Sequence, residues 1–210
     1  MEQLGRRERK KLQSRKTILA AAVSEFSKRG YRETSVADIM RAADLGIGTF
    51  YNYFDSKEDL LFSLLARLSE MIRIALSEAR AAERTPIELL EVASYVTAKF
   101  LDENRFVLPL FLSASHHASV QGAAPMHVRG KTEHKRNRTT PQIKEVFAEI
   151  IAQGQETGEI RSDVPVDLIA EMFHSLYQAA AFSYLDIPFQ ENVMLKTRLL
   201  LDGIRVRRKA

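Results

Sequence analysis

Apolar residues recur at intervals of three and four along almost the whole chain, and this spacing constrains the fold more than any other feature. The longest stripe comprises Leu60, Leu61, Leu64, Leu65, Leu68, Met71, Ile72 and Ala75. Such spacing places apolar side chains on one face of an α-helix. β-branched residues nowhere alternate cleanly with polar ones, as a half-buried strand would require. We therefore expect an all-α chain of about nine helices.

Capping residues and glycines indicate where these helices begin and end. Gly30 ends the first helix, and Thr34 or Ser35 can cap a short second helix that runs to about Ala42. Thr85 and Glu88 have capping-box spacing at the start of a fifth helix. The other helices are expected at about residues 47–53, 56–75, 105–115, 141–151, 166–185 and 190–207.

Composition limits the class of protein. The chain has 210 residues and no Cys, which excludes a disulfide framework, cysteine zinc sites and cysteine nucleophiles. Neither a signal-peptide core nor a run of roughly 18 uncharged apolar residues is present, so we expect a cytoplasmic protein with no membrane partner. The sequence lacks a Gly-rich phosphate loop, G-x-S-x-G and H-E-x-x-H, and we expect neither an enzyme nor a cofactor.

Two short helices between residues 36 and 54 have apolar faces that can pack together as a helix-turn-helix, with Gly46 giving freedom to the turn. The inner face of the second is expected to hold Ile47, Phe50 and Phe54. The outer face is small and uncharged and comprises Gly48, Thr49, Asn52 and Tyr53. Thr and Asn can reach base edges in DNA, which favours DNA binding. The alternative is a small helical subdomain whose tyrosines cover its core.

The stretch "GYRETSVADIMRAADLGIGTFYNYFDSKEDLLFSLL", Gly30 to Leu65, resembles the DNA-binding region of the TetR family of bacterial transcriptional regulators. The resemblance implies a homodimer whose two recognition helices enter successive major grooves of double-stranded DNA at a near-palindromic operator. It implies a ligand-responsive regulator, usually a repressor. By the same resemblance, the DNA-contact candidates are Thr34, Ser35, Arg41, Gly48, Thr49, Tyr51, Asn52, Tyr53 and Lys57.

We expect two domains: residues 1–54 as the DNA-binding domain and residues 55–210 as a helical domain for effector binding and dimerisation. Residues 1–16 hold seven Lys or Arg against two Glu. This basic segment is either a solvated tail or an arm that contacts phosphates.

The last two helices are apolar on two faces. On the helix at 166–185 one face holds Leu168, Met172, Leu176 and Ala179, and the other holds Ile169, Phe173, Tyr177, Ala180 and Tyr184. On the helix at 190–207 the two sets are Val193, Leu200 and Ile204, and Leu195, Leu199 and Val206. A helix with two apolar faces needs two partners, one of which can be a second subunit. The alternative is a helix wholly buried in a monomer.

Aromatic residues of the middle helices can line a small-molecule site. The candidates are Phe100, Phe106, Phe111, His116, Phe147, Phe173, His174 and Tyr177. The abundance of Phe and Leu favours an apolar or amphipathic effector. For each residue the alternative is simple core packing. His116 and His117 lack a clear helical partner, so we expect no metal site.

Overall fold

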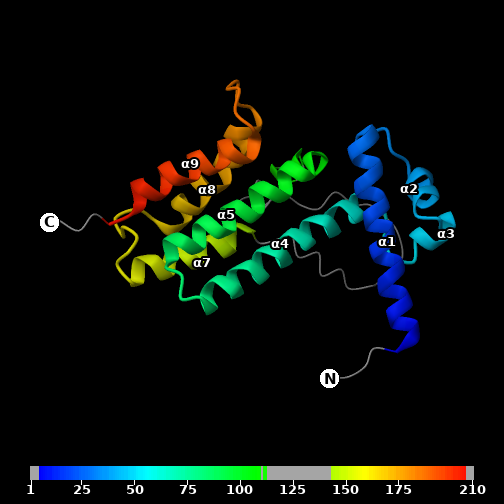
Figure 1. Cartoon of the computed structure of the whole chain (residues 1–210), viewed down its shortest axis with the longest axis horizontal. Helices are drawn as coiled ribbons and strands as arrows, with labels where there is room; N and C mark the ends of the chain where they lie inside the picture. The colour runs from blue at the N-terminus through cyan, green and yellow to red at the C-terminus, as the bar shows by residue number, and fades with distance from the viewer. Residues whose placement is uncertain (1–4, 110, 113–142, 207–210) are drawn as a thin grey trace, which may run out of the picture. The chain divides into compact units, whose positions relative to one another are not determined.

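The computed structural model describes residues 5–109, 111–112 and 143–206, and the regular elements in these ranges are all helical (Figure 1). They are α1 (Arg6–Arg29), α2 (Val36–Ala42), α3 (Ile47–Phe50), α4 (Lys57–Ala81), α5 (Pro86–Glu103), the 3-10 helix η1 (Arg105–Val107), α7 (Ile143–Glu156), α8 (Val166–Ala181) and α9 (Phe189–Ile204). The all-α fold is confirmed, with eight α-helices in the described residues where about nine were expected.

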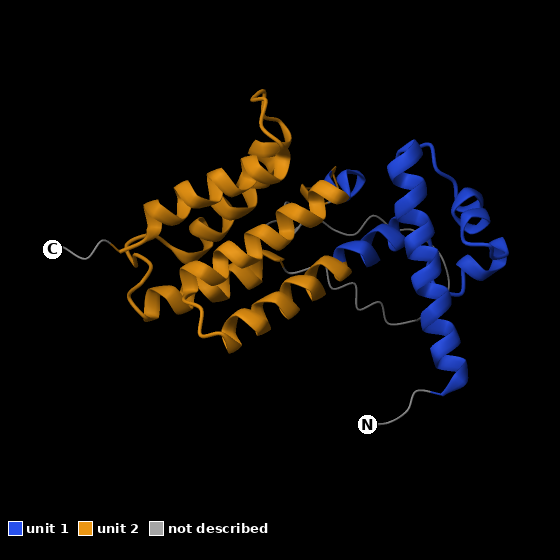
Figure 2. Cartoon of the chain, viewed as in Figure 1, with its two compact units in different colours: residues 1–65, 104–108 blue, residues 66–103, 109–210 orange. Residues whose placement is uncertain are grey.

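The chain forms two compact units (Figure 2). The first unit comprises residues 1–65 and 104–108, and the second comprises residues 66–103 and 109–210. The first turns of α4 belong to the first unit and the remainder of α4 belongs to the second. The helix is therefore the continuous element that both units share.

The first unit is built on α1, which packs against α2 and η1, while α2 packs against α3. Aromatic rings fill its core. Phe26 lies 5.2 Å from Tyr31, and Phe50 lies 5.5 Å from Phe54, measured between ring centroids. Phe26, Phe50 and Phe54 are almost completely buried. Burial of their apolar surface holds α2, α3 and the loop after α1 in place.

In the second unit, α5 packs against α7 and α9, and α8 also packs against both. Phe147 and Phe173 meet across the α7–α8 contact with ring centroids 5.1 Å apart. A Cβ atom added at Gly154 would lie 2.4 Å from Cδ1 of Ile160, so this position has no room for a side chain. The chain can therefore fold back closely after α7.

The helices α8 and α9 differ from the expected ranges at their ends. α8 stops at Ala181 and α9 begins at Phe189 and ends at Ile204. The expected place of Tyr184 on an apolar face of the helix at 166–185 is wrong, because Tyr184 lies in the connecting loop and is fully exposed. No described helix is long and apolar enough to cross a membrane.

Candidate DNA interface

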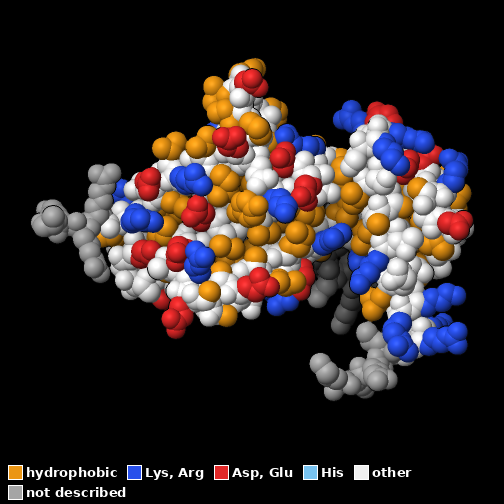
Figure 3. Space-filling view, viewed as in Figure 1, with side chains coloured by type: hydrophobic (Ala, Val, Ile, Leu, Met, Phe, Trp, Pro, Cys, Tyr) orange, Lys and Arg blue, Asp and Glu red, His pale blue; other side chains and the backbone are white. Residues whose placement is uncertain are grey.

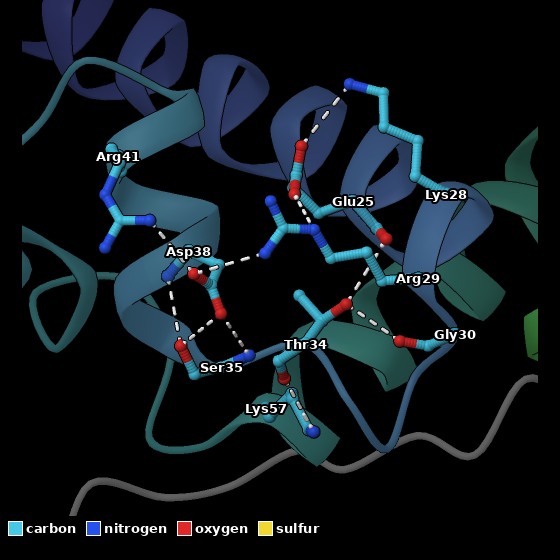
Figure 4. Close-up of polar contacts among 9 residues, drawn as sticks. All are labelled: Glu25, Lys28, Arg29, Gly30, Thr34, Ser35, Asp38, Arg41 and Lys57. Atoms are coloured by element: carbon cyan, nitrogen blue, oxygen red, sulfur yellow. Dashed lines mark hydrogen bonds and ion pairs between the residues drawn. The ribbon is translucent and has the colours of Figure 1, made fainter.

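Ser35 begins α2 through a reciprocal capping box (Figure 4). The backbone N–H of Asp38 donates to Ser35 Oγ at 3.1 Å, and the backbone N–H of Ser35 donates to Asp38 Oδ2 at 3.0 Å. The Ser35 hydroxyl also donates to Asp38 Oδ2 at 2.6 Å. These bonds satisfy donors that a helix start leaves free. They also hold the pKa of Asp38 below its usual value, chiefly through the Ser35 hydroxyl.

Asp38 also holds two arginines beside the start of α2. Its Oδ1 lies 3.1 Å from Arg41 Nη1 and 3.6 Å from Arg29 Nη1. The side chain of Arg41 is 75% exposed, so this ion pair adds little stability. Its effect is to orient a guanidinium that faces solvent (Figure 4). Sequence reasoning missed this role of Asp38, although the Ser35-x-x-Asp38 spacing could have revealed it.

The short helix α3 and the turn after it together expose a polar, uncharged face, which we call the α3 face. Tyr51 is 60% exposed, Gly48 and Asn52 are exposed, and Thr49 and Tyr53 are half-buried. Nothing lies within 4 Å of a Cβ atom placed at Gly48, so close approach from outside is open there. Beneath this face Phe50 is completely buried, so its ring supports the surface from within.

The expected inward position of Ile47 is wrong, because its side chain is 53% exposed. α3 is only four residues long, and Ile47 is its first residue. A helical wheel averages over several turns and cannot place a side chain at the end of a single turn. Ile47 therefore adds an apolar group beside the uncharged face.

The turn before α3 does not depend on Gly46. Gly46 has φ −67° and ψ 144°, which any residue can adopt. The left-handed residue is Asp44, with φ 54°. Asp tolerates this conformation better than most residues because its short side chain can bond locally. The expected role of Gly46 is therefore wrong, and Asp44 makes the turn.

Thr34 is buried and Lys57 is half-buried, and both bond to backbone carbonyls of the first unit (Figure 4). Thr34 is 1% exposed, and its hydroxyl donates to the carbonyl of Gly30 at 2.7 Å. Lys57 Nζ donates to the carbonyls of Tyr31 and Thr34 at 2.6 and 2.9 Å. It also lies 4.3 Å from the centroid of the Tyr31 ring. Both residues stabilise the α1–α2 loop, and their polar groups are engaged there and not directed to a DNA surface.

Lys57→Met is expected to lower the free energy of unfolding of the first unit by about 1–3 kcal/mol, because two carbonyls lose their donor. Urea unfolding monitored by circular dichroism measures this change. The slope of log Kd for DNA against log salt concentration is expected to stay the same. A slope reduced by about one unit would instead identify Lys57 as a phosphate contact.

The basic segment at the N-terminus is helical from Arg6 onward. Its Lys and Arg side chains gather around the N-terminal end of α1 (Figure 3). Arg15 differs from the others, because its guanidinium donates to Ser63 Oγ at 3.0 Å and lies 5.3 Å from the Phe54 ring centroid. One of the seven cations therefore holds α1 to the first turns of α4.

The aromatic candidates of the second unit are only partly brought together. Phe111 lies 5.1 Å from the His174 ring and 5.3 Å from the Tyr177 ring, between centroids. Phe173 packs on Phe147, and Phe100 is buried on α5. Phe106 is not in this group.

Phe106 lies in the first unit, where its ring packs 5.2 Å from that of Phe26. The helical pattern at 105–115 hid this, because the chain changes units between Leu108 and Pro109. His116 and His117 lie outside the described residues.

A helix-turn-helix with an exposed uncharged face, joined to a second helical unit, defines the class of helix-turn-helix DNA-binding proteins. Residues 18–64 match the family model for bacterial regulatory proteins of the tetR family. The HTH-type transcriptional repressor DhaR of Mycobacterium sp. strain GP1 is 30% identical over 167 residues, which cover 79% of each chain. The chain therefore belongs to the TetR family of bacterial transcriptional regulators.

Solved structures agree on the fold. The FadR repressor of Thermus thermophilus, in complex with lauroyl-CoA, is 27% identical, with a TM-score of 0.57 and coverage of 93% of this chain and 97% of that one. The FadR regulator of Bacillus subtilis, in complex with stearoyl-CoA, is 20% identical, with a TM-score of 0.64 and coverage of 90% and 98%. The ketosteroid regulator KstR2 of Mycobacterium tuberculosis is 21% identical, with a TM-score of 0.59 and coverage of 92% and 95%.

Proposed function

We propose that two copies of this chain repress transcription from a near-palindromic operator and release it when an apolar or amphipathic effector binds the second unit. The observation that carries the proposal is the exposed, uncharged α3 face over the buried ring of Phe50. A face of this kind fits closely into a major groove and can read base edges by hydrogen bonds. The relatives support the proposal, since DhaR and KstR2 are described as transcriptional repressors.

The proposed DNA contacts come from α2, α3 and the turn after α3. They are Ser35, Arg41, Gly48, Thr49, Tyr51, Asn52 and Tyr53. Thr49 and Asn52 read bases, and the tyrosine hydroxyls bind phosphates and fix the orientation. Arg41 contributes a cation that Asp38 orients. Ser35 caps α2 at its N-terminus, which would face the phosphate backbone of the DNA.

The proposed dimer contact is the outward face of α8 and α9. Its exposed apolar side chains are Leu168, Met172, Leu195 and Leu199, and the exposed Val206 follows the end of α9. The opposite faces of the same helices are buried in the second unit through Phe173 and Val193. Exposed apolar side chains gathered on one face mark an interface, and a second copy around a two-fold axis covers them.

The proposed effector site is the aromatic group of the second unit, within residues 55–210. Its members are Phe100, Phe111, Phe147, Phe173, His174 and Tyr177. Two solved relatives hold long-chain acyl-CoA ligands, which are amphipathic. α4 contributes residues to both units. A ligand that favours one position of α4 therefore shifts the population toward dimers whose two first units no longer fit the operator.

The test is a gel-shift titration of the purified chain on the DNA upstream of its own gene. The probes for release are lauroyl-CoA and stearoyl-CoA, with coenzyme A alone as the control. We expect a specific complex that competitor DNA does not remove and that at least one acyl-CoA dissociates. An affinity that neither acyl-CoA changes would contradict control by this ligand class. A weak affinity, uniform across sequences, would contradict operator recognition itself.

Asn52→Ala and Tyr51→Ala are each expected to weaken operator binding about 10- to 100-fold, because each removes a base or phosphate contact worth about 1–3 kcal/mol. Both side chains are exposed, so the melting temperature should change by less than about 2 °C. Fluorescence anisotropy and thermal melting measure the two effects. Tyr95→Ala, at an exposed tyrosine of α5, is the matched control and should leave both unchanged.

A further inference from the structure

One hydroxyl group on α5 and one on α8 are buried without a hydrogen-bond partner among the described residues. They are Oη of Tyr177 on α8 and Oγ of Ser94 on α5, and both side chains are almost completely buried. Buried hydroxyls normally have a partner, because an unsatisfied one keeps the full cost of losing water. The two groups therefore have unused hydrogen-bonding capacity inside the core.

The two hydroxyls are neighbours. Burial raises the pKa of the Tyr177 hydroxyl, and the hydroxyls of Thr97 and Ser94 act against this rise. The Thr97 hydroxyl donates its proton to the carbonyl of Ala93 at 2.8 Å, so Thr97 can accept a further hydrogen bond but cannot donate one. Ser94 on α5 and Tyr177 on α8 therefore each keep a hydroxyl proton for which the described residues supply no acceptor in hydrogen-bond geometry.

Aromatic rings surround this pair of donors. The Phe111 ring meets the Tyr177 ring edge-on at 5.3 Å, and Phe111 is itself buried. Phe173 lies one helical turn from Tyr177 on α8 and is also buried. The surroundings suit hydrocarbon, and the donors are neutral. A ligand carboxylate held only by neutral hydroxyls would pay a large desolvation cost, whereas an uncharged oxygen would not.

We propose that Tyr177 and Ser94 donate hydrogen bonds to one uncharged carbonyl oxygen of the effector, whose hydrocarbon part packs on Phe111 and Phe173. This inference rests on the proposed function, which places the effector in the second unit. A carbonyl oxygen has two lone pairs and can accept from both donors at once. The pair therefore selects a carbonyl compound over a pure hydrocarbon of the same shape.

The first experiment measures the melting temperature of the ligand-free full chain. Tyr177→Phe keeps the ring and removes only the unsatisfied hydroxyl, so the melting temperature is expected to stay the same or rise by about 2–4 °C. Tyr95→Phe, at the exposed tyrosine of α5, is the matched control and should change nothing. A fall of more than about 2 °C for Tyr177→Phe would show that the hydroxyl already has a partner, and would overturn the proposal.

The second experiment compares two probes by titration calorimetry: 2-decanone and 2-methyl-1-decene, in which a methylene group replaces the carbonyl oxygen. The unmodified chain is expected to bind the ketone about tenfold more tightly. Tyr177→Phe and Ser94→Ala should each reduce this preference, and Tyr95→Phe should keep it. Absence of ketone binding, equal binding of the two probes, or a full preference in Tyr177→Phe would each overturn the proposal.

The same ketone added to the operator complex separates this proposal from the proposed function. Tighter binding of the ketone without release of DNA would support the carbonyl site and contradict control of DNA binding by the ligand. Release of DNA by both probes equally would keep ligand control and contradict the carbonyl site.

Discussion

Phe50→Ala is expected to unfold the first unit or to lower its free energy of unfolding by about 3–5 kcal/mol, the usual cost of removing a core aromatic ring. Phe50 is completely buried and contacts the rings of Phe54 and Tyr51, at 5.5 and 5.4 Å between centroids. α3 makes little hydrogen-bonded structure of its own, since it is four residues long. Its position therefore depends on burial of this ring, and operator binding should be lost with it.

Urea unfolding of the full chain, followed by circular dichroism, measures this change. The matched control is Tyr51→Ala, which removes a similar ring from the adjacent position on the exposed side. We expect a large loss of stability for Phe50→Ala and a change within about 0.5 kcal/mol for Tyr51→Ala. Equal destabilisation by the two substitutions would contradict the assignment of inner and outer faces.

Leu199→Asp is expected to convert the dimer to a monomer and to weaken operator binding by at least about 100-fold. Leu199 is 74% exposed on α9, so an Asp there faces solvent in the isolated chain and costs little stability. In the dimer the carboxylate would be buried in an apolar contact without a partner. Operator affinity falls as well, because two linked first units bind two half-sites far more tightly than a single first unit binds one half-site.

Sedimentation velocity measures the oligomeric state, and anisotropy measures operator binding. Ile74→Asp is the matched control, since Ile74 is also an exposed apolar residue but lies on α4. We expect this variant to remain dimeric. A Leu199→Asp variant that still sedimented as a dimer would contradict the α8–α9 interface.

The sequence predicted the helices well where their own residues determine them. Ser56 Oγ accepts from the backbone N–H of Asp59 at 3.1 Å at the start of α4. Thr85 and Glu88 form the expected reciprocal bonds before α5, at 2.9 and 3.4 Å. Each of α8 and α9 also has the two apolar sets that the pattern predicted, one buried and one more exposed, except that Tyr184 and Val206 lie beyond the helix ends. Both helices are long enough for the 3.6-residue period to apply.

The sequence predicted less well where tertiary contacts decide. Thr34 and Ser35 were equal candidates to cap α2, and only the fold turns Thr34 to the carbonyl of Gly30 and leaves Ser35 as the cap. Lys57 is the first residue of α4, and its sequence context does not distinguish it from a solvated lysine. In the structure it donates to backbone carbonyls of the loop between α1 and α2. Phe106 belongs to the first unit because the chain returns there after α5. No local pattern carries this information.

The central claim is that α2 and α3 present a closely fitting, uncharged surface to DNA twice, in a symmetric pair of chains. Nuclease protection across the DNA upstream of the chain's own gene tests this most directly. We expect two protected half-sites of related, inverted sequence, with centres about one helical turn apart, and their loss with Asn52→Ala. An unprotected region at protein concentrations that saturate non-specific DNA, or protection of a single half-site, would contradict the account.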